Sequence, residues 1–138
     1  MKKHLGYNDE EMKKFRKNPR NVQILAKAPE LMNRTIVAEV VESKGCNSQH
    51  KVGDKFIFDG AGNLLTKKNP KRICLSALAP LAPMIWAINE LTFAGVDPNE
   101  IKLKLNRAGC SDVGVDCGGW GHIVMEVRVE ERQRQQKT

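Results

Sequence analysis

Alternation of apolar and polar residues near the end of the chain limits the fold more than any other feature. Apolar side chains occupy every second position from Ile123 to Val129, with Glu126 and Arg128 between them. This period is typical of a strand with one buried face and one solvent-exposed face. Further strands are predicted over 35–43, 54–59 and 101–107, with a short return strand over 64–66. Together these strands predict an antiparallel sheet with one solvent-exposed face.

Such a sheet needs a cover for its apolar face, and the segment between Cys74 and Ala94 supplies one. Its apolar residues recur at helical spacing from position 82, and Pro80 and Pro83 predict a kink or a fresh start over 80–83. Gly95 is a natural end for the helix. We therefore expect an α+β fold, in which a small antiparallel sheet packs against one long core helix over 83–94.

Residues 1–33 are expected to form an N-terminal helical arm. Asn8 or Asp9 can cap a helix, and Asn18-Pro19 should interrupt it, because the residue before proline avoids the helical region. Ala28-Pro29 should end or kink it again. The arm would pack on the body or, alternatively, on a second subunit of a homo-oligomer. The predicted organisation is an arm over 1–33, a core domain over 34–131 and a polar tail over 132–138.

Charge and hydropathy limit the class of protein. The chain has 138 residues and a net charge of +7, which permits an anionic partner. No aromatic-rich strand or basic docking helix accompanies this charge, so nucleic acid is a weaker expectation than a solvated surface. No apolar segment resembles a secretion signal or is long enough to span a membrane. A cytoplasmic location is expected.

Four cysteines are the most informative residues for function. In a reducing compartment they indicate metal ligands or reactive thiols rather than disulfides. Cys46 and His50 stand four residues apart in a polar loop, and the other three each lie at the boundary of a predicted element: Cys74, Cys110 and Cys117. An antiparallel sheet could bring several of these boundaries together.

Two kinds of chemistry fit these residues. Cys46, His50, Cys74 and Cys110, with Cys117 in reserve, could hold zinc or iron, which select thiolate and imidazole ligands. Alternatively, Cys74 at the start of a helix could be a thiolate nucleophile, with His50 as base and Asp112 orienting a histidine. Because no C-x2-C pair is present, inert buried thiols stay an equal alternative. Trp120 is expected to anchor its loop on the core, and His122 to be structural.

Several of these residues match the sequence pattern of a known protein family. Gly45-Cys46, His50 to Phe56, Cys74 with its apolar segment and Cys110-Ser111-Asp112 resemble the pattern of a family of small uncharacterised bacterial proteins. The resemblance covers roughly residues 35–130. It implies a shared fold and a common role for Cys46, His50, Cys74 and Cys110, and it implies no reaction. Leu75 and Ser111 replace prolines of that pattern, and Cys117 with the Gly-Gly-Trp-Gly loop is additional.

The leading functional expectation is a small metal-dependent enzyme or accessory subunit that uses zinc or iron on a small molecule, which could be anionic. One alternative is a non-catalytic basic module that binds nucleic acid or an acidic protein. The other is a thiol redox protein without metal.

Overall fold

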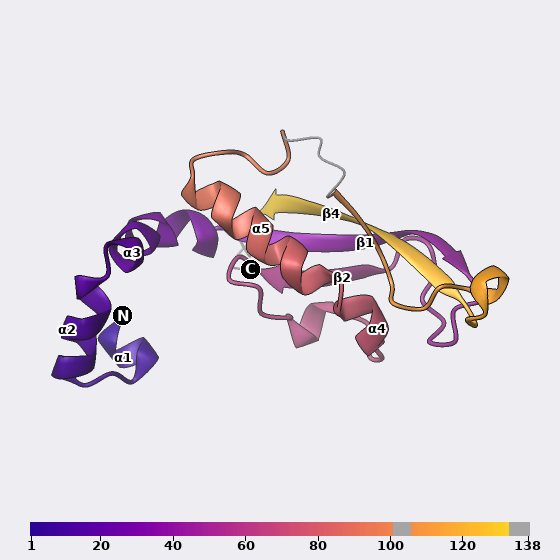
Figure 1. Cartoon of the computed structure of the whole chain (residues 1–138), viewed down its shortest axis with the longest axis horizontal. Coiled ribbons are helices and arrows are strands. Elements are labelled where there is room, and N and C mark those ends of the chain that lie inside the picture. The colour runs from indigo at the N-terminus through magenta and orange to yellow at the C-terminus, as the bar shows by residue number, and fades with distance from the viewer. Residues whose placement is uncertain (101–105, 133–138) are drawn as a thin grey trace, which may run out of the picture.

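A computed structural model describes residues 1–100 and 106–132, and within them four antiparallel strands form one sheet in the order β2-β1-β4-β3 (Figure 1). The predicted α+β fold with an antiparallel sheet is therefore confirmed. The strands are β1 (Arg34–Lys44), β2 (Lys55–Asp59), β3 (Arg107–Gly109) and β4 (His122–Glu131).

Strand β1 is the centre of the sheet, since it pairs with β2 on one side and β4 on the other. Ile36 lies opposite Phe58 in β2 and Val129 in β4. The β1–β4 register shifts between Val40 and Glu42, a β-bulge that bends the strand. Beyond the bulge the far end of β1 lies against the first residues of β4, where the loops of the candidate site begin.

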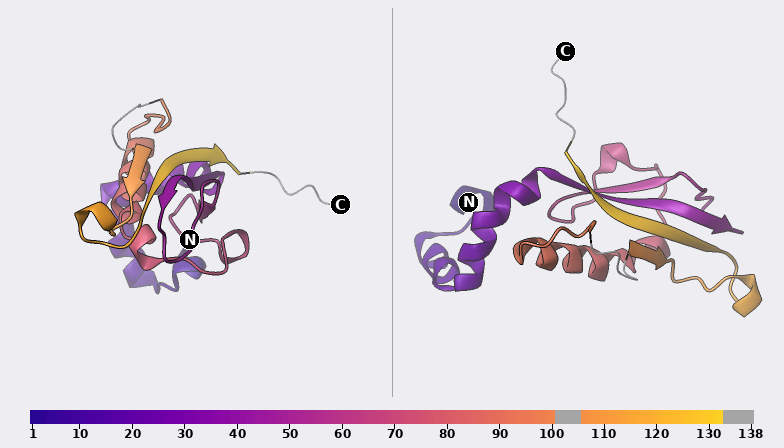
Figure 2. Two further views of the ribbon diagram at one scale, coloured as in Figure 1. Left: turned by 90° about the vertical axis from the view of Figure 1, so that its right-hand side faces the viewer. Right: turned by 90° about the horizontal axis from the view of Figure 1, so that it is seen from above.

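Helix α5 (Leu81–Phe93) covers one face of the sheet, as Figure 2 shows. Leu81 and Ile85 of this helix are buried with Phe56, Val40 and Met125 of the sheet. Ala79 and Pro80 separate α5 from the short α4 (Leu75–Leu78), which confirms the predicted break near position 80. Gly95 follows with a φ of +78°, the left-handed conformation that glycine adopts cheaply after a helix.

The opposite face of the sheet carries charged side chains, as the alternation predicted. The Glu39 carboxylate of β1 forms salt bridges with the guanidinium of Arg128 in β4, at 3.1 Å, and with the ammonium of Lys55 in β2, at 3.7 Å. Arg107 of β3 pairs with Glu126 of β4 at 3.2 Å. These pairs cross neighbouring strands, so they favour the observed register more than they add to stability.

The N-terminal arm consists of α1 (Lys2–Leu5), α2 (Asp9–Lys17) and α3 (Pro19–Met32), and it extends beyond one end of the sheet (Figure 1). Asn8 caps α2 in a reciprocal capping box with Glu11, and the predicted interruption at Asn18-Pro19 is confirmed. The expectation that Ala28-Pro29 could end the helix is wrong: α3 continues to Met32. Proline there removes one hydrogen bond from the last turn only.

Four other local predictions differ from the structure or fall outside it. The return strand over 64–66 is reduced to a bridge between Phe58 and Leu64. The backbone N–H of Leu65 still donates to the carbonyl of Ile57, but the Ile57 N–H donates to the side-chain oxygen of Asn69 and not to a strand. The loop predicted from Ala108 begins two residues later, after β3. The strand predicted over 101–107 lies mostly outside the described residues, as does the polar tail.

Candidate functional site

A cavity of about 190 Å³ lies at the end of the sheet opposite the arm, where three loops meet. The loop between β1 and β2, the start of α4, and the loop between β3 and β4 lie at this end of the sheet (Figure 1), and residues of all three line the cavity. Its lining comprises Cys46, Asn47, Ser48, His50, Cys74, Ser76, Ala77, Cys110, Asp112, Trp120, Gly121, His122 and Ile123. Side chains up to 77 positions apart along the chain thus share one hollow.

The structure brings Cys46, His50, Cys74 and Cys110 to this one cavity, as the positions of the loops predicted. Cys117 does not line it. That thiol is exposed in a short 3-10 turn, η3 (Val115–Cys117), within the β3–β4 loop. The four cysteines are therefore of two kinds: three half-buried thiols around the cavity and one open to solvent.

Cys74 is the thiol whose pKa the surrounding residues lower. The Ser48 hydroxyl is the largest influence that lowers the pKa of Cys74, and the amides of Ala77 and Ser76 and the Ser76 hydroxyl act in the same direction. Burial opposes them, and the net effect is a lowered pKa. Hydrogen-bond donors aimed at a sulfur favour its charged form. The arrangement can therefore hold a thiolate at Cys74.

His50 lies beneath Cys74 and is 4% exposed. Its Nε2 accepts a hydrogen bond from the backbone N–H of Cys74 at 3.2 Å, and its ring packs edge-on against Phe56. Burial lowers the pKa of His50, although Asp54 acts against it. A neutral imidazole that accepts through Nε2 carries its proton on Nδ1. His50 thus supports the backbone at Cys74, whereas the sequence suggested a base for the sulfur.

A second thiol and imidazole lie side by side on the β3–β4 side of the cavity. The Cys110 Sγ is 3.5 Å from Nδ1 of His122 and accepts the backbone N–H of Ile123 at 3.4 Å. His122 Nδ1 also contacts the carbonyl oxygen of Asp112. Gly109 makes room for this imidazole, since a Cβ there would lie 2.9 Å from two ring atoms.

Sequence reasoning assigned His122 a structural role and so missed it as a cavity residue. The signal was available in the pairing of the strands. Cys110 follows β3, His122 begins β4, and antiparallel strands place such positions side by side. The register itself needed the structure.

Asp112 organises the glycine-rich loop through its carboxylate. The carboxylate accepts the backbone N–H groups of Gly114 at 2.9 Å, Trp120 at 3.1 Å and Gly121 at 3.2 Å. These amides, Gly114 foremost, lower the pKa of Asp112. The carboxylate therefore holds the loop, and it is the carbonyl oxygen of this residue, not the carboxylate, that contacts His122.

The expected role of Trp120 as an anchor on the core is wrong. Its side chain is 75% exposed and borders the cavity. The physical reason is that Asp112 closes the loop through backbone amides, so the loop does not need the indole to fold.

Two glycines bring the β1–β2 loop into backbone contact with the β3–β4 loop. A Cβ on Gly121 would lie 2.0 Å from the carbonyl oxygen of Gly45 and 2.7 Å from the amide nitrogen of Cys46. Gly45 has a φ of +66°, which favours glycine. Only residues without side chains permit this approach, and it closes the cavity beside Cys46.

Metal binding depends on donors that converge as well as on their type. Thiols and imidazoles suit zinc or iron. Within residues 1–100 and 106–132, however, no three Cys, His, Asp or Glu side chains are grouped closely enough to hold an ion. The donor types fit a metal, whereas their present arrangement does not.

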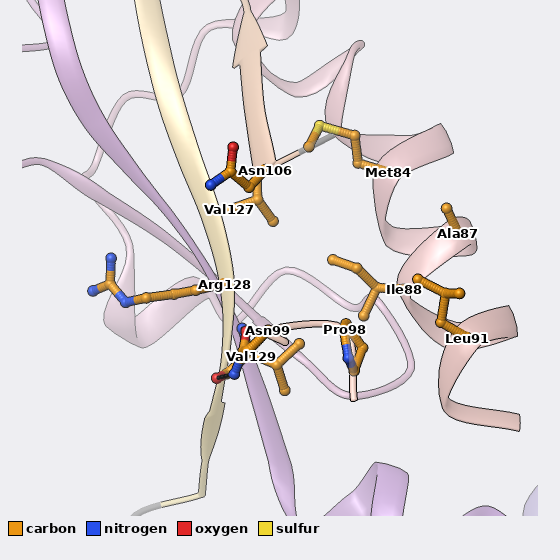
Figure 3. Close-up of a pocket in the computed structure, with 10 residues that line it drawn as sticks. All are labelled: Met84, Ala87, Ile88, Leu91, Pro98, Asn99, Asn106, Val127, Arg128 and Val129. Atoms are coloured by element: carbon orange, nitrogen blue, oxygen red, sulfur yellow. Dashed lines mark hydrogen bonds between the residues drawn. The ribbon is translucent and has the colours of Figure 1, made fainter. Parts of the chain in front are cut away.

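Another hollow, of about 40 Å³, lies between α5 and β4 (Figure 3). Met84 and Ile88 of the helix face Val127 and Val129 of the strand across it (Figure 3). The described residues that line it include no thiol or imidazole. The cavity around Cys74 is therefore the better candidate for chemistry.

Comparison with known proteins adds no assignment: no family model, curated protein or solved structure matches the chain. The resemblance to a bacterial family stays a prediction. Among the described helices, none has the length and apolar character needed to cross a membrane.

Proposed function

We propose that the protein acts on a small molecule through a thiolate at Cys74, inside the cavity at the end of the sheet. The observation that carries this proposal is the place of Cys74 in the cavity lining beside Ser48, Ser76 and Ala77, three residues that lower the pKa of its thiol. A deprotonated thiol is the reactive form of cysteine, and a lowered pKa increases its fraction at neutral pH. The site would thus supply a nucleophile without a separate base.

The other cavity residues have supporting roles in this proposal. The Cys74 sulfur forms a bond to an electrophilic carbon of the substrate, while the electron pair of the breaking bond leaves with the departing group. His50 fixes the backbone at Cys74 and is a positioning residue. Cys110 and His122 face the same space and could contact the bound molecule.

Alkylation of the untreated protein tests the proposal, and the chain supplies its own reference thiol. Limiting iodoacetamide at neutral pH, followed by peptide mass spectrometry, gives a rate for each of the four cysteines. We expect Cys74 to react faster than Cys117 although Cys117 is the more exposed thiol, because the thiolate is the attacking species. A rate at Cys117 that equals or exceeds that at Cys74 would overturn the proposal.

The second candidate is binding of zinc or iron at the same cavity. Three thiols and two imidazoles border it, and this observation favours soft or borderline metals. The ligands would come from Cys46, His50, Cys74, Cys110 and His122 after a turn of their side chains. A bound ion would supply Lewis-acid chemistry or a structural link.

Elemental analysis of protein purified without a histidine tag tests the metal candidate. Near-stoichiometric zinc or iron that is lost in Cys74→Ser and in Cys110→Ser, and retained in Cys117→Ser, would support it. The Cys117→Ser protein is a matched control, because it removes a thiol outside the cavity. Protein free of metal after growth and purification with both metals supplied would refute it.

A further inference from the structure

The exposed indole of Trp120 needs a physical explanation. Its side chain is 75% exposed, yet its backbone N–H is held by Asp112 at 3.1 Å. Gly119 is packed so closely that a Cβ would lie 2.2 Å from an oxygen of the same carboxylate. The loop is therefore fixed while its large aromatic side chain stays uncovered at the cavity. Burial of an aromatic surface is favourable, so a ligand that covers the indole would gain that free energy.

The charge around the cavity limits which ligand this can be. Among the described residues that line it, none is lysine or arginine. The acidic groups there are the Asp112 carboxylate and the thiol of Cys74, whose pKa is lowered. The Asp112 carboxylate would repel an anion, as would Cys74 in its thiolate form. This lining gives no support to the anionic ligand that the net charge of the chain had suggested.

We infer that Trp120 is a stacking platform for the ligand of this cavity, and that the ligand carries a flat ring that is neutral or positively charged. The inference rests on the proposed function, and it names the substrate class of the same site. An indole face attracts aromatic rings by offset stacking and attracts cations through its π electrons. The reactive end of the ligand would then lie toward Cys74.

Two alkylating agents that differ only in a ring test the inference. Rates at Cys74 are measured with iodoacetamide and with N-phenyl iodoacetamide. The ratio of the two rates reports the effect of the ring, because the intrinsic reactivity of the thiol contributes equally to both. We expect the ring to raise the Cys74 rate roughly three- to tenfold relative to Cys117 in the same protein. Trp120→Ala should abolish this preference and Trp120→Phe should keep part of it.

Trp86 provides the matched control, because it is 69% exposed on α5 and does not line the cavity. Trp86→Ala should leave the ring preference unchanged. A preference that survives in Trp120→Ala, or that is absent from the original protein, would overturn the inference even when Cys74 itself is reactive. The proposed function would then still stand.

A measurement without reaction keeps the two hypotheses separate. In Cys74→Ser protein, the indole N–H resonances of Trp120 and Trp86 are followed during titration with the N-methylnicotinamide cation and, separately, with benzoate. We expect the cation to shift the Trp120 resonance with saturation, and to move Trp86 little. Equal or absent shifts at the two indoles, or a stronger response to benzoate, would contradict the inference whatever the reactivity of Cys74.

Discussion

The backbone N–H of Cys74 donates a hydrogen bond to Nε2 of His50, 3.2 Å away. This bond joins the β1–β2 loop to the start of α4, 24 residues later in the chain. It also fixes the tautomer of a buried imidazole, since an accepting Nε2 leaves the proton on Nδ1. One hydrogen bond thus couples the position of Cys74 to the neutral form of a buried histidine.

We expect His50→Ala to destabilise the fold by about 2–4 kcal/mol, because it leaves a cavity against Phe56 and removes the acceptor for the Cys74 N–H. Chemical denaturation measures the free energy of unfolding. His4→Ala is the control, since His4 is exposed in α1 and its loss should change stability by less than about 0.5 kcal/mol. Equal effects of the two substitutions would contradict a supporting role for His50.

Stability should depend on pH through His50. Burial holds the pKa of His50 below its ordinary value of 6.5. The unfolded chain therefore binds the extra proton first as the pH falls, so the stabilisation is complete above about pH 6.5 and is lost below it. Urea denaturation from about pH 7 down to about pH 5 should show this decline. Parallel pH profiles for the original protein and His50→Gln would show that another group is responsible.

Ser48→Ala should raise the pKa of Cys74, because the Ser48 hydroxyl is the largest influence that lowers it. Loss of a hydrogen bond to a charged group should slow alkylation of Cys74 at neutral pH roughly three- to tenfold. The limiting rate at high pH should be unchanged, which a rate–pH profile checks. Ser111→Ala removes an exposed hydroxyl nearby and serves as control. A Ser48→Ala profile identical to that of Ser111→Ala would argue against the thiolate.

Gly121→Ala should separate the two loops that meet beside Cys46. The added Cβ would lie 2.0 Å from the carbonyl oxygen of Gly45, and backbone atoms on both sides cannot yield without a shift of the loops. We expect a loss of about 2–3 kcal/mol in stability and faster alkylation of Cys46. Gly6→Ala tests a glycine with open space around it and should cost about 1 kcal/mol through its φ alone. Similar losses for both would mean that the loop contact is unimportant.

Patterns within short stretches located most elements correctly. The alternation around Met125 identified β4, and Asn18-Pro19 identified the break between α2 and α3, because each signal depends on neighbouring residues alone. The same reasoning failed where a distant group decided the outcome. The side-chain oxygen of Asn69 accepts the N–H of Ile57 that a longer return strand would have bonded, and no local sequence pattern predicts that contact.

Some residues of the candidate site could likewise be predicted from the sequence, and others could not. Cys46, His50, Cys74 and Cys110 could be named from the sequence because thiols and imidazoles are chemically distinctive and stood at element boundaries. The positions of His122 and Trp120 could not, since they depend on the register of β4 and on the hydrogen bonds of Asp112.

Side-chain type and spacing were enough to predict the α+β class, the exposed and buried faces of the sheet and the residues able to do chemistry. Three further properties needed the folded chain: three thiols share a cavity, Cys117 lies outside it, and His50 supports a backbone amide. Those outcomes depend on close contacts between loops distant in the chain, where a missing Cβ or a single hydrogen bond fixes which side chains meet.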